Sequence, residues 1–557
     1  MKKKLIVLAI GVIPAMYGAS GQWTPTGNAS WNVNANWTPI STFPNGISDN
    51  ATFANSALAT ATVGSSGVIN ILLGNLAYTG STNTYNIAFT GGSTLTVVST
   101  IILDSGVTAG QTIATPLTIG ASGSIANNSA VTLTISQPIS VNTLTYGGSA
   151  NGTLLLSAVN AQSAGTTINA GTVSVSTDSN LGNGGAIITL NGGTLNTTAS
   201  FSSSRNVTLG ASNGTIKVTG AGVTTTLSGI LSSTGSLTKT DTGTLVLTNT
   251  GNTYSGGTIL SAGTVSISDN NQLGNTNAGA ITFSGGTLAF TGTPTIPIGR
   301  STSITTSGII DTGGVTVTYN SNITGGASAT LTKNSSGTLN IGGTCTYGGG
   351  TTINNGTFSI AAGGLISTTG AVTLNGGVFD ISNDNANVTI GNLSGTNGQI
   401  NTGARILTFG TSTGGPFSYA GTATGTSAGA LRKVGTTQIN FTASSTYPGT
   451  VQVQGGTFAL TGNGNLSSSA SVDITISGSA TFDISGISAA GTTIANLSGT
   501  TGIVTLGAKA LTYGTATSPV ELDSTINGSG GSLVKQGTGN SQLTGTNTYT
   551  GGTTINA

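Results

Sequence analysis

The chain has 557 residues with 13 basic and 12 acidic side chains, a net charge of +1, no histidine, 90 glycines and 11 prolines. Apolar residues make up 36%, which argues against disorder, because disordered chains combine low hydrophobicity with high net charge. So few basic residues leave no electrostatic footprint for nucleic acid or for an anionic membrane. Abundant glycine with sparse charge also argues against helices, so strands and turns remain.

The N-terminus has the organisation of a secretory signal peptide. Three lysines follow Met1, the apolar run Leu5–Ile13 comes next, and small residues occupy positions 18–21. A membrane-spanning helix needs about 20 apolar residues, and this run is too short. We therefore predict a signal peptide over residues 1–20, cleaved near Ser20, and a mature chain without a transmembrane segment.

The next segment, residues 21–57, contains all three tryptophans, Trp23, Trp31 and Trp37. A solenoid end exposes an apolar cross-section and unpaired strand edges, and a distinct cap must cover them. We interpret this aromatic segment as an N-terminal cap. An alternative that stays open is an aromatic platform for carbohydrate.

From residue 58 to residue 557 the chain consists of short alternating runs such as Thr94–Val98, Val131–Ile135 and Thr244–Thr248, separated by Gly, Asn and Ser. Period-two alternation with turn residues between runs predicts strands. The runs recur about every ten residues, which leaves no room for crossover helices. We predict an all-β protein, a right-handed parallel β-helix with coils of roughly 20–22 residues. The alternative is a set of β-sandwiches of about 100 residues each.

A longer repeat is superimposed on these runs, with a unit of about 100 residues in five degenerate copies. Leu-x-Lys recurs four times, and each copy is followed by a tyrosine with glycine close behind it, whereas the first copy has Tyr146 at the lysine position. The chain ends inside a repeat, so we expect it to be truncated. The predicted signature residues, all with a structural role, are Lys239, Lys333, Lys433, Lys535, Tyr254, Tyr347, Tyr447, Tyr549, Gly243, Gly337, Gly435 and Gly537.

Three stretches carry a family resemblance: Lys239-x-x-x-Gly243-Thr-Leu-Val-Leu-Thr-Asn, then Asn252-Thr-Tyr-Ser-Gly-Gly-Thr, then Ala262-Gly-Thr-Val. This block resembles the passenger-associated transport repeat, also called the autotransporter-associated beta strand repeat. The resemblance implies an exported bacterial surface protein, associated with the outer membrane, whose passenger forms a parallel β-helix. It also implies an outer-membrane translocator, a β-barrel beyond residue 557.

The composition limits the chemistry of any site. Without histidine, Ser-His-Asp triads, Cys-His pairs and imidazole metal sites are excluded. We predict no catalytic, cofactor-binding or metal-binding residue, and we expect the single cysteine, Cys345, to be a partly buried filler. We interpret three carboxylate pairs as solvated turn residues: Glu521 with Asp523, Asp380 with Asp384, and Asp473 with Asp483.

The recurrent lysines and tyrosines lie in copies about 100 residues apart, and so several coils apart, and cannot converge on one small substrate. We expect each lysine to keep one strand outside the core and to discourage lateral pairing. We expect each tyrosine to cover a corner glycine.

These observations favour a non-enzymatic, exported bacterial surface protein that acts as a stalk or adhesin. The expected partners are a host surface or a polymeric glycan, besides the translocator. Two alternatives stay open. One is a β-helical carbohydrate-active enzyme, a polysaccharide lyase or glycosidase, and the other is a secreted matrix component without an anchor.

Overall fold

The computed structural model describes residues 21–25, 29–38, 43–54, 60–64, 70–121, 123–148, 152–275, 279–474, 480–514 and 520–556. The predicted signal peptide lies outside these residues. The chain divides into two compact units, residues 1–219 with 223–235 (unit 1) and residues 220–222 with 236–557 (unit 2). Among the described residues, no helix has the length and apolar character needed to cross a membrane.

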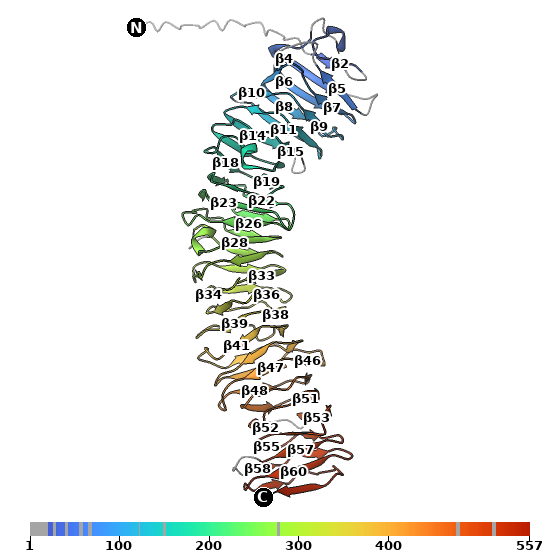
Figure 1. The fold of residues 1–557 in the computed structure, drawn as a ribbon, viewed down its shortest axis with the longest axis vertical. Helices are drawn as coiled ribbons and strands as arrows, with labels where there is room; N and C mark the ends of the chain where they lie inside the picture. The colour runs from blue at the N-terminus through green and yellow to red at the C-terminus, as the bar shows by residue number, and fades with distance from the viewer. Residues whose placement is uncertain are drawn as a thin grey trace, which may run out of the picture. The chain divides into compact units, whose positions relative to one another are not determined.

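Unit 1 is built from parallel ladders in which each strand pairs with a strand one coil away (Figure 1). Its largest sheet has 13 strands, in the order β24 (Leu231–Ser232), β21 (Val207–Leu209), β18 (Ile187–Leu190), β16 (Gly165–Ile168), β14 (Thr143–Gly148), β11 (Ser124–Asn127), β8 (Thr94–Leu103), β6 (Asn70–Thr79), β4 (Gly46–Ala54), β1 (Gly21–Trp23) and β3 (Trp37–Thr38), with β10 (Leu117–Ile119) and β13 (Ile139–Ser140) branching from β8. Among the described residues, β1 with β3 is the single antiparallel pair.

A second ladder of unit 1 runs in chain order. It comprises β2 (Ala29–Ser30), β5 (Thr60–Gly64), β7 (Thr84–Ile87), β9 (Gln111–Ile113), β12 (Thr132–Ile135), β15 (Thr153–Leu156), β17 (Thr172–Val175), β19 (Thr194–Thr197) and β22 (Gly214–Val218). Two further strands pair with each other, β20 (Phe201–Ser203) and β23 (Thr224–Leu227). Short 3-10 helices interrupt the strands at η1 (Asn34–Asn36) and η2 (Asp178–Leu181).

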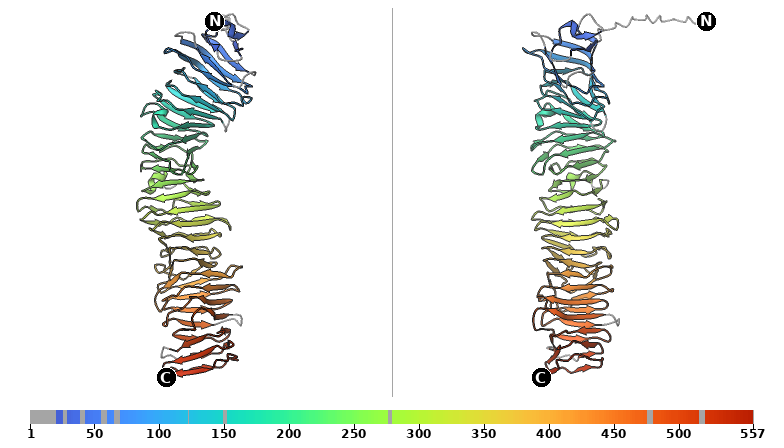
Figure 2. Two further views of the ribbon diagram at one scale, coloured as in Figure 1. Left: turned by 45° about the vertical axis from the view of Figure 1, so that its right-hand side comes forward. Right: turned by 90° about the vertical axis from the view of Figure 1, so that its right-hand side faces the viewer.

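Unit 2 repeats the same construction (Figure 2). One ladder has β25 (Leu237–Thr240), β27 (Thr258–Leu260), β29 (Ile281–Phe283), β32 (Thr302–Ile304) and β35 (Ile323–Gly325). The longest has β26 (Thr244–Leu247), β28 (Thr264–Ile267), β30 (Thr287–Phe290), β33 (Ser307–Asp311), β36 (Thr330–Asn334), β38 (Gly350–Ile353), β40 (Val372–Leu374), β43 (Leu393–Gly395), β46 (Phe417–Tyr419), β49 (Gln438–Phe441), β51 (Thr457–Gly462), β53 (Thr481–Ile487), β56 (Ile503–Thr505) and β59 (Thr525–Asn527).

Four shorter ladders complete unit 2. They are β31 (Thr295–Ile296), β34 (Thr316–Tyr319), β37 (Thr338–Ile341), β39 (Thr357–Ile360), β41 (Val378–Asp380), β44 (Gln399–Asn401) and β47 (Thr422–Thr424); β42 (Val388–Thr389), β45 (Ile406–Phe409), β48 (Ala430–Lys433), β50 (Thr450–Val453), β52 (Ser471–Ile474) and β55 (Asn496–Ser498); β54 (Gly491–Thr493), β57 (Ala510–Tyr513), β60 (Ser532–Gln536) and β62 (Thr553–Asn556); and β58 (Val520–Leu522) with β61 (Ser541–Leu543). The 3-10 helix η3 spans Asn270–Leu273.

The register of these ladders explains the alternating sequence. Leu339 pairs with Phe358 and Phe358 with Phe379, so successive partners are 19 and 21 residues apart. All three side chains are buried. On each strand, the residues directly before and after the buried one point to the opposite face of the sheet, as the period of two requires. The prediction of an all-β parallel β-helix is confirmed, and the β-sandwich alternative is wrong because sandwich sheets are antiparallel. The right-handed sense stays a prediction.

The aromatic segment of unit 1 folds into a buried cluster. Trp23, Trp31 and Trp37 are 2%, 0% and 2% exposed, and their rings pack around Phe53 at centroid distances of 5.8, 5.9 and 5.9 Å. The Trp31 indole donates to the carbonyl of Pro44, and the Trp37 indole donates to the carbonyl of Trp31. An exposed carbohydrate platform formed by these tryptophans is therefore wrong, because their faces are covered by one another.

Replacing Phe53 with alanine should lower the stability of this cluster by about 3–5 kcal/mol, because a buried ring surrounded by aromatic neighbours leaves a cavity. All three tryptophans of the chain lie in the cluster, so the midpoint of urea unfolding followed by tryptophan fluorescence should fall. The control is Phe417→Ala on β46, a half-exposed ring of unit 2, which should leave that midpoint unchanged. Equal midpoints for the native chain and Phe53→Ala would contradict the packing argument.

Candidate functional site

The four signature lysines are buried, which corrects the expectation that they keep a strand outside the core. Lys239, Lys333, Lys433 and Lys535 are 0%, 0%, 1% and 6% exposed. Each points inward from the end of its strand, at a position that an aliphatic residue occupies in the next coil. Burying an ammonium group is costly unless its N–H donors are all satisfied. The surroundings of Nζ therefore decide what these lysines do.

Lys333 shows how the charge is accommodated. Its position is in register with Ile310 on one side and Ile353 on the other. The methylene stem thus continues the aliphatic column, and Nζ donates to the carbonyls of Asn334 and Ser335, both at 2.7 Å. A third donation goes to the carbonyl of Asn355 in the next coil at 3.2 Å. Three donors meet three acceptors, so the ammonium is fully bonded to backbone.

The same arrangement, which we call the lysine cage, recurs in the other copies. Lys239 donates to the carbonyls of Thr240, Asp241 and Ala262, at 2.8, 2.7 and 3.3 Å. Lys433 donates to the carbonyls of Val434, Gly435 and Gly455. The acceptors of Lys535 are the carbonyls of the two residues that follow it, Gln536 and Gly537. The two bonds to the following carbonyls therefore recur in all four copies, and the bond to the next coil recurs in the first three. The four lysines lie on four different ladders, on β25, β36, β48 and β60.

Each cage closes a turn in the left-handed backbone region. The second residue after the lysine has a positive φ in every copy: 63° at Asp241, 64° at Ser335, 67° at Gly435 and 73° at Gly537. Asp and Ser are unfavourable in this region. The ammonium bonds the two carbonyls that flank the left-handed residue. At Asp241 and Ser335 it stabilises a backbone conformation that the side chain disfavours, whereas Gly435 and Gly537 adopt it freely.

The glycine of the next coil fits against the cage. Gly356 has φ +66°, and a Cβ on it would lie 2.3 Å from the carbonyl oxygen of Gly337. Gly263 has φ +64°, and a Cβ on it would lie 2.7 Å from Nζ of Lys239. Both the backbone angle and the space therefore require glycine here.

Burial lowers the pKa of the Lys239, Lys333 and Lys433 ammonium groups from 10.5 to about 8, while the carboxylates of Asp241 and Asp311 raise the pKa of the first two. At pH 7 these groups keep their proton, and each ammonium retains all three N–H donors.

The signature glycines do not occupy one structural position. Gly243 and Gly337 stand four residues after their lysines, whereas Gly435 and Gly537 stand two residues after theirs. Only the second pair lies in the left-handed turn of the cage. A Cβ at Gly337 would lie 2.1 Å from the carbonyl oxygen of Val315, so close backbone approach is its reason for being glycine.

Three of the four signature tyrosines pack within the core, and the fourth, Tyr549, is partly exposed. Tyr254, Tyr347 and Tyr447 are 0%, 1% and 0% exposed. The hydroxyl of Tyr254 shares a hydrogen bond with Thr258 four residues on, and the Tyr347 and Tyr549 hydroxyls do the same with their own fourth residue.

The Tyr254 ring also covers a glycine, because a Cβ on Gly274 would lie 2.9 Å from the ring. Burial raises the pKa of Tyr254 to about 12. The tyrosine therefore contributes packing and a fixed corner, with no reactive hydroxyl.

Two buried arginines were not singled out as site residues from sequence. Arg205 holds η2 through an ion pair with Asp178 at 2.9 Å and through the backbone carbonyls of Asn183, Ala186 and Gly182. Arg300 holds η3 in the same way, with Asn270 in place of the carboxylate. Each arginine follows its 3-10 helix by more than twenty residues, so no local sequence signal reports the pairing.

The carboxylate pairs show no catalytic grouping. Glu521 and Asp523 are both exposed on and beside β58. Asp380 and Asp483 each accept a backbone N–H two residues ahead, as turn carboxylates commonly do. The prediction that Asp384 is a solvated turn residue is wrong, because its side chain is buried, with 2% exposed. Within the described residues, no three His, Cys, Asp or Glu side chains gather as metal ligands would.

Cys345 is 1% exposed, and burial raises the pKa of its thiol to about 12. The cysteine is thus fully buried, more so than the partly buried filler that we expected. A thiol with so high a pKa is a poor nucleophile.

The outer faces of the ladders carry columns of small uncharged side chains. In unit 1, the ladder register brings four threonines into one column: Thr145, Thr167, Thr189 and Thr208. In unit 2, Thr332, Thr352, Thr373 and Ser394 form a similar column.

Beside this second column, the amides of Asn334, Asn354 and Asn375 form a hydrogen-bonded chain, with steps of 2.9 and 3.0 Å. We call these two adjacent columns of unit 2 the hydroxyl–amide face. It offers neutral hydrogen-bonding groups at the strand spacing of about 4.8 Å.

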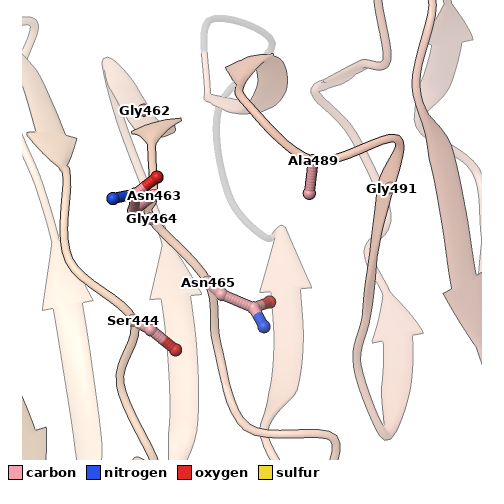
Figure 3. Close-up of a pocket in the computed structure, with 7 residues that line it drawn as sticks. All are labelled: Ser444, Gly462, Asn463, Gly464, Asn465, Ala489 and Gly491. Carbon is pink, nitrogen blue, oxygen red and sulfur yellow. The ribbon is translucent and has the colours of Figure 1, made fainter.

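A small pocket of about 190 Å³ lies at the corner formed by Ser444, Gly462–Asn465, Ala489 and Gly491 (Figure 3). Its polar side chains come from Ser444, Asn463 and Asn465. The side-chain oxygen Oδ1 of Asn465 already accepts a hydrogen bond from the Thr492 hydroxyl. Among the lining residues that the structure describes, none is charged, so these residues provide neither an acid nor a base.

The fold and the cages define a parallel β-helical repeat protein, and sequence comparison identifies the repeat. The passenger-associated-transport-repeat family matches residues 151–175, 237–267, 331–360, 431–460 and 533–557. The chain therefore carries five passenger-associated transport repeats, and the resemblance inferred from its residues is confirmed. The last four matches contain the four lysine cages.

The chain is also similar to a named protein, the Adhesin BmaC autotransporter of Brucella suis biovar 1 (strain 1330), with 32% identity over 257 residues. The alignment covers 45% of this chain but only 7% of that relative. No solved structure matches the chain.

Replacing Lys333 with methionine should destabilise the surrounding coils by about 1–3 kcal/mol, because the stem still packs but buried carbonyls lose their donor. Solenoid stability is largely local, so backbone amides of β36–β39 should exchange hydrogen faster while those of β48–β51 keep their rates. Mass spectrometry after deuterium exchange measures both. Lys217→Met, at a half-exposed position on β22, is the control. Unchanged exchange in β36–β39 would mean that the cage contributes no stability.

Proposed function

We propose that the chain is the β-helical passenger of an autotransporter-type protein, displayed outside the bacterial cell as an adhesin or stalk. The five passenger-associated transport repeats carry this proposal, and the similarity to an autotransporter adhesin supports it. In this proposal, residues 1–20 are the signal peptide, residues 21–57 the cap and residues 58–557 the β-helix, and an outer-membrane translocator is the export partner.

The outer surface supports an adhesive role that involves binding and no catalysis. The hydroxyl–amide face presents uncharged groups at a repeating spacing, which suits an extended partner such as a polymeric glycan or a host-surface protein better than a small molecule. The buried lysines and tyrosines have their polar groups bonded internally, so they are not available to a substrate. The carbohydrate-active enzyme alternative would need a carboxylate pair, and Glu521 with Asp523 is the pair that sequence suggested for it.

An adhesive role predicts that the intact chain binds host cells or immobilised glycans through its outer columns. The double change Thr352→Lys/Asn354→Lys places two charges on the hydroxyl–amide face and leaves the core untouched. It should lower adhesion several-fold in a bead-binding assay. The matched control, Thr282→Lys/Ser303→Lys, alters outward positions of β29 and β32. Adhesion that survives on the altered face would place the contact elsewhere, and absence of any adhesion would favour the stalk role.

The proposed non-enzymatic role predicts that acidic polysaccharides incubated with the chain keep their length. The variant Glu521→Gln/Asp523→Asn should behave like the native chain in reducing-end and size-exclusion assays. Depolymerisation by the native chain that the double change abolishes would instead establish the carbohydrate-active alternative.

A further inference from the structure

The third acceptor of the Lys333 cage belongs to an asparagine that is followed by a glycine. Nζ of Lys333 donates to the backbone carbonyl of Asn355 at 3.2 Å, and this carbonyl forms the peptide bond to the nitrogen of Gly356. In the Lys239 and Lys433 cages, the acceptors in the next coil are the carbonyls of an alanine and a glycine. Of these three cages, the Lys333 cage is therefore the one whose acceptor residue carries a carboxamide.

The Asn355 side chain is turned back onto the next peptide nitrogen. Its Oδ1 accepts the backbone N–H of Gly356 at 2.7 Å. A C=O bond is about 1.23 Å long, so Cγ lies no farther than about 3.9 Å from that nitrogen. Atoms about 3–3.5 Å apart are positioned to react, and this pair is close to that range. Asn355 is exposed, so water reaches it.

Other Asn-Gly pairs hold the glycine nitrogen differently. In the pair Asn191–Gly192, the glycine N–H donates to the carbonyl of Asn213 at 2.6 Å. In the pair Asn463–Gly464, it donates to the carbonyl of Thr461 at 2.9 Å. In both pairs the glycine N–H is directed at a backbone carbonyl, away from the preceding carboxamide.

The Lys333 ammonium acts on the peptide group that contains the Gly356 nitrogen. When that nitrogen loses its proton, much of the negative charge resides on the Asn355 carbonyl oxygen. A cation that is hydrogen-bonded to this oxygen stabilises the charge where it develops, and the stabilisation is larger away from bulk water. The cage therefore makes the Gly356 nitrogen a better nucleophile.

We propose that Asn355 is a site of spontaneous covalent modification, at which the Lys333 cage promotes formation of a succinimide and its hydrolysis to isoaspartate. The Gly356 nitrogen forms a bond to Cγ of Asn355, the Cγ–Nδ2 bond breaks, and Nδ2 leaves with the Gly356 proton as ammonia. Water then adds to the former main-chain carbonyl carbon. The bond from this carbon to the Gly356 nitrogen breaks, the nitrogen takes a proton, and a carboxylate remains. No group is oxidised or reduced.

The product places a carboxylate where the cage has a neutral acceptor. In isoaspartate the chain continues through Cγ, and the former main-chain carbonyl becomes a free carboxylate. Nζ of Lys333 already donates to this oxygen, so the product pairs the two charges across two coils. This charge-assisted bond favours isoaspartate over aspartate, because aspartate keeps its carboxylate on the exposed side chain. The proposal does not depend on the adhesin role.

The test measures deamidation of the full chain, folded in buffer and unfolded in guanidinium chloride, near neutral pH in water labelled with oxygen-18. Peptide mapping by mass spectrometry follows each Asn-Gly pair, and electron-transfer fragmentation distinguishes isoaspartate from aspartate. Asn355 should react roughly tenfold faster in the folded chain, because one charge-assisted hydrogen bond stabilises the amidate. Asn191 and Asn463 should react more slowly in the folded chain than in the unfolded one.

Two variants separate the ammonium from the stability of the coils. Lys333→Met should slow the reaction of Asn355 roughly tenfold and lower the share of isoaspartate. Phe358→Ala keeps the cage and opens a cavity at a buried position of β39, so it loosens the same coils, as hydrogen exchange of β36–β39 will show. It should slow the reaction less than Lys333→Met does. Lys433→Met, which alters the next cage, should leave the rate at Asn355 unchanged.

Three results would each overturn the proposal. The first is that Asn355 reacts no faster in the folded chain than in the unfolded one. The second is that Phe358→Ala slows the reaction as much as Lys333→Met, which would assign the effect to the order of the coils. The third is that aspartate is the main product in the folded chain.

Discussion

The structure depends on the register between coils. Each strand pairs in parallel with a strand about twenty residues away, so every inward position meets the inward positions of the coils above and below it. The type of residue at each inward position is therefore restricted by the side chains above and below it in the column, as well as by its own strand. Small outward residues, glycine corners and aliphatic interiors all follow from that constraint. A polar group that enters a column is costly unless its donors and acceptors are bonded within its own coil or a neighbouring one.

The lysine cage is the most specific solution to this requirement. The methylene stem of the lysine takes the place of one aliphatic side chain in a column. Its ammonium group donates hydrogen bonds to backbone carbonyls. Because the lysines lie on four different ladders, the hundred-residue repeat is not a whole number of identical coils. It is conserved in local geometry, with a strand end, a left-handed turn and a glycine in the next coil. Each repeat therefore contains the same type of turn after its lysine. The four lysines do not line up into one column of charged side chains.

Much of the fold could be predicted from sequence, because alternation with a period of two and the absence of crossover helices leave few architectures. The charge of the lysines predicts an outer position, whereas the period of two predicts an inner one, and the inner one is correct. Leu331 and Lys333 are two residues apart on one strand, so alternation places both side chains on the same side, and Leu331 is buried. The contacts of Arg205, the cage acceptor at Asn355 and the environment of Asp384 could not be predicted. These contacts join residues of different coils, and the residue types near each position do not indicate which residues of the next coil will lie beside it.

The third acceptor of a lysine cage has a consequence for assembly. For Lys333 this acceptor is the carbonyl of Asn355, which belongs to the following coil. Without the following coil, one N–H donor of the lysine ammonium has no carbonyl partner. Adding the successor supplies a partner for the ammonium together with a fresh layer of apolar contacts. A solenoid cut just after the coil of Lys239, Lys333 or Lys433 would lack both that hydrogen bond and the apolar layer above it, so such an end is less stable than one that includes the following coil.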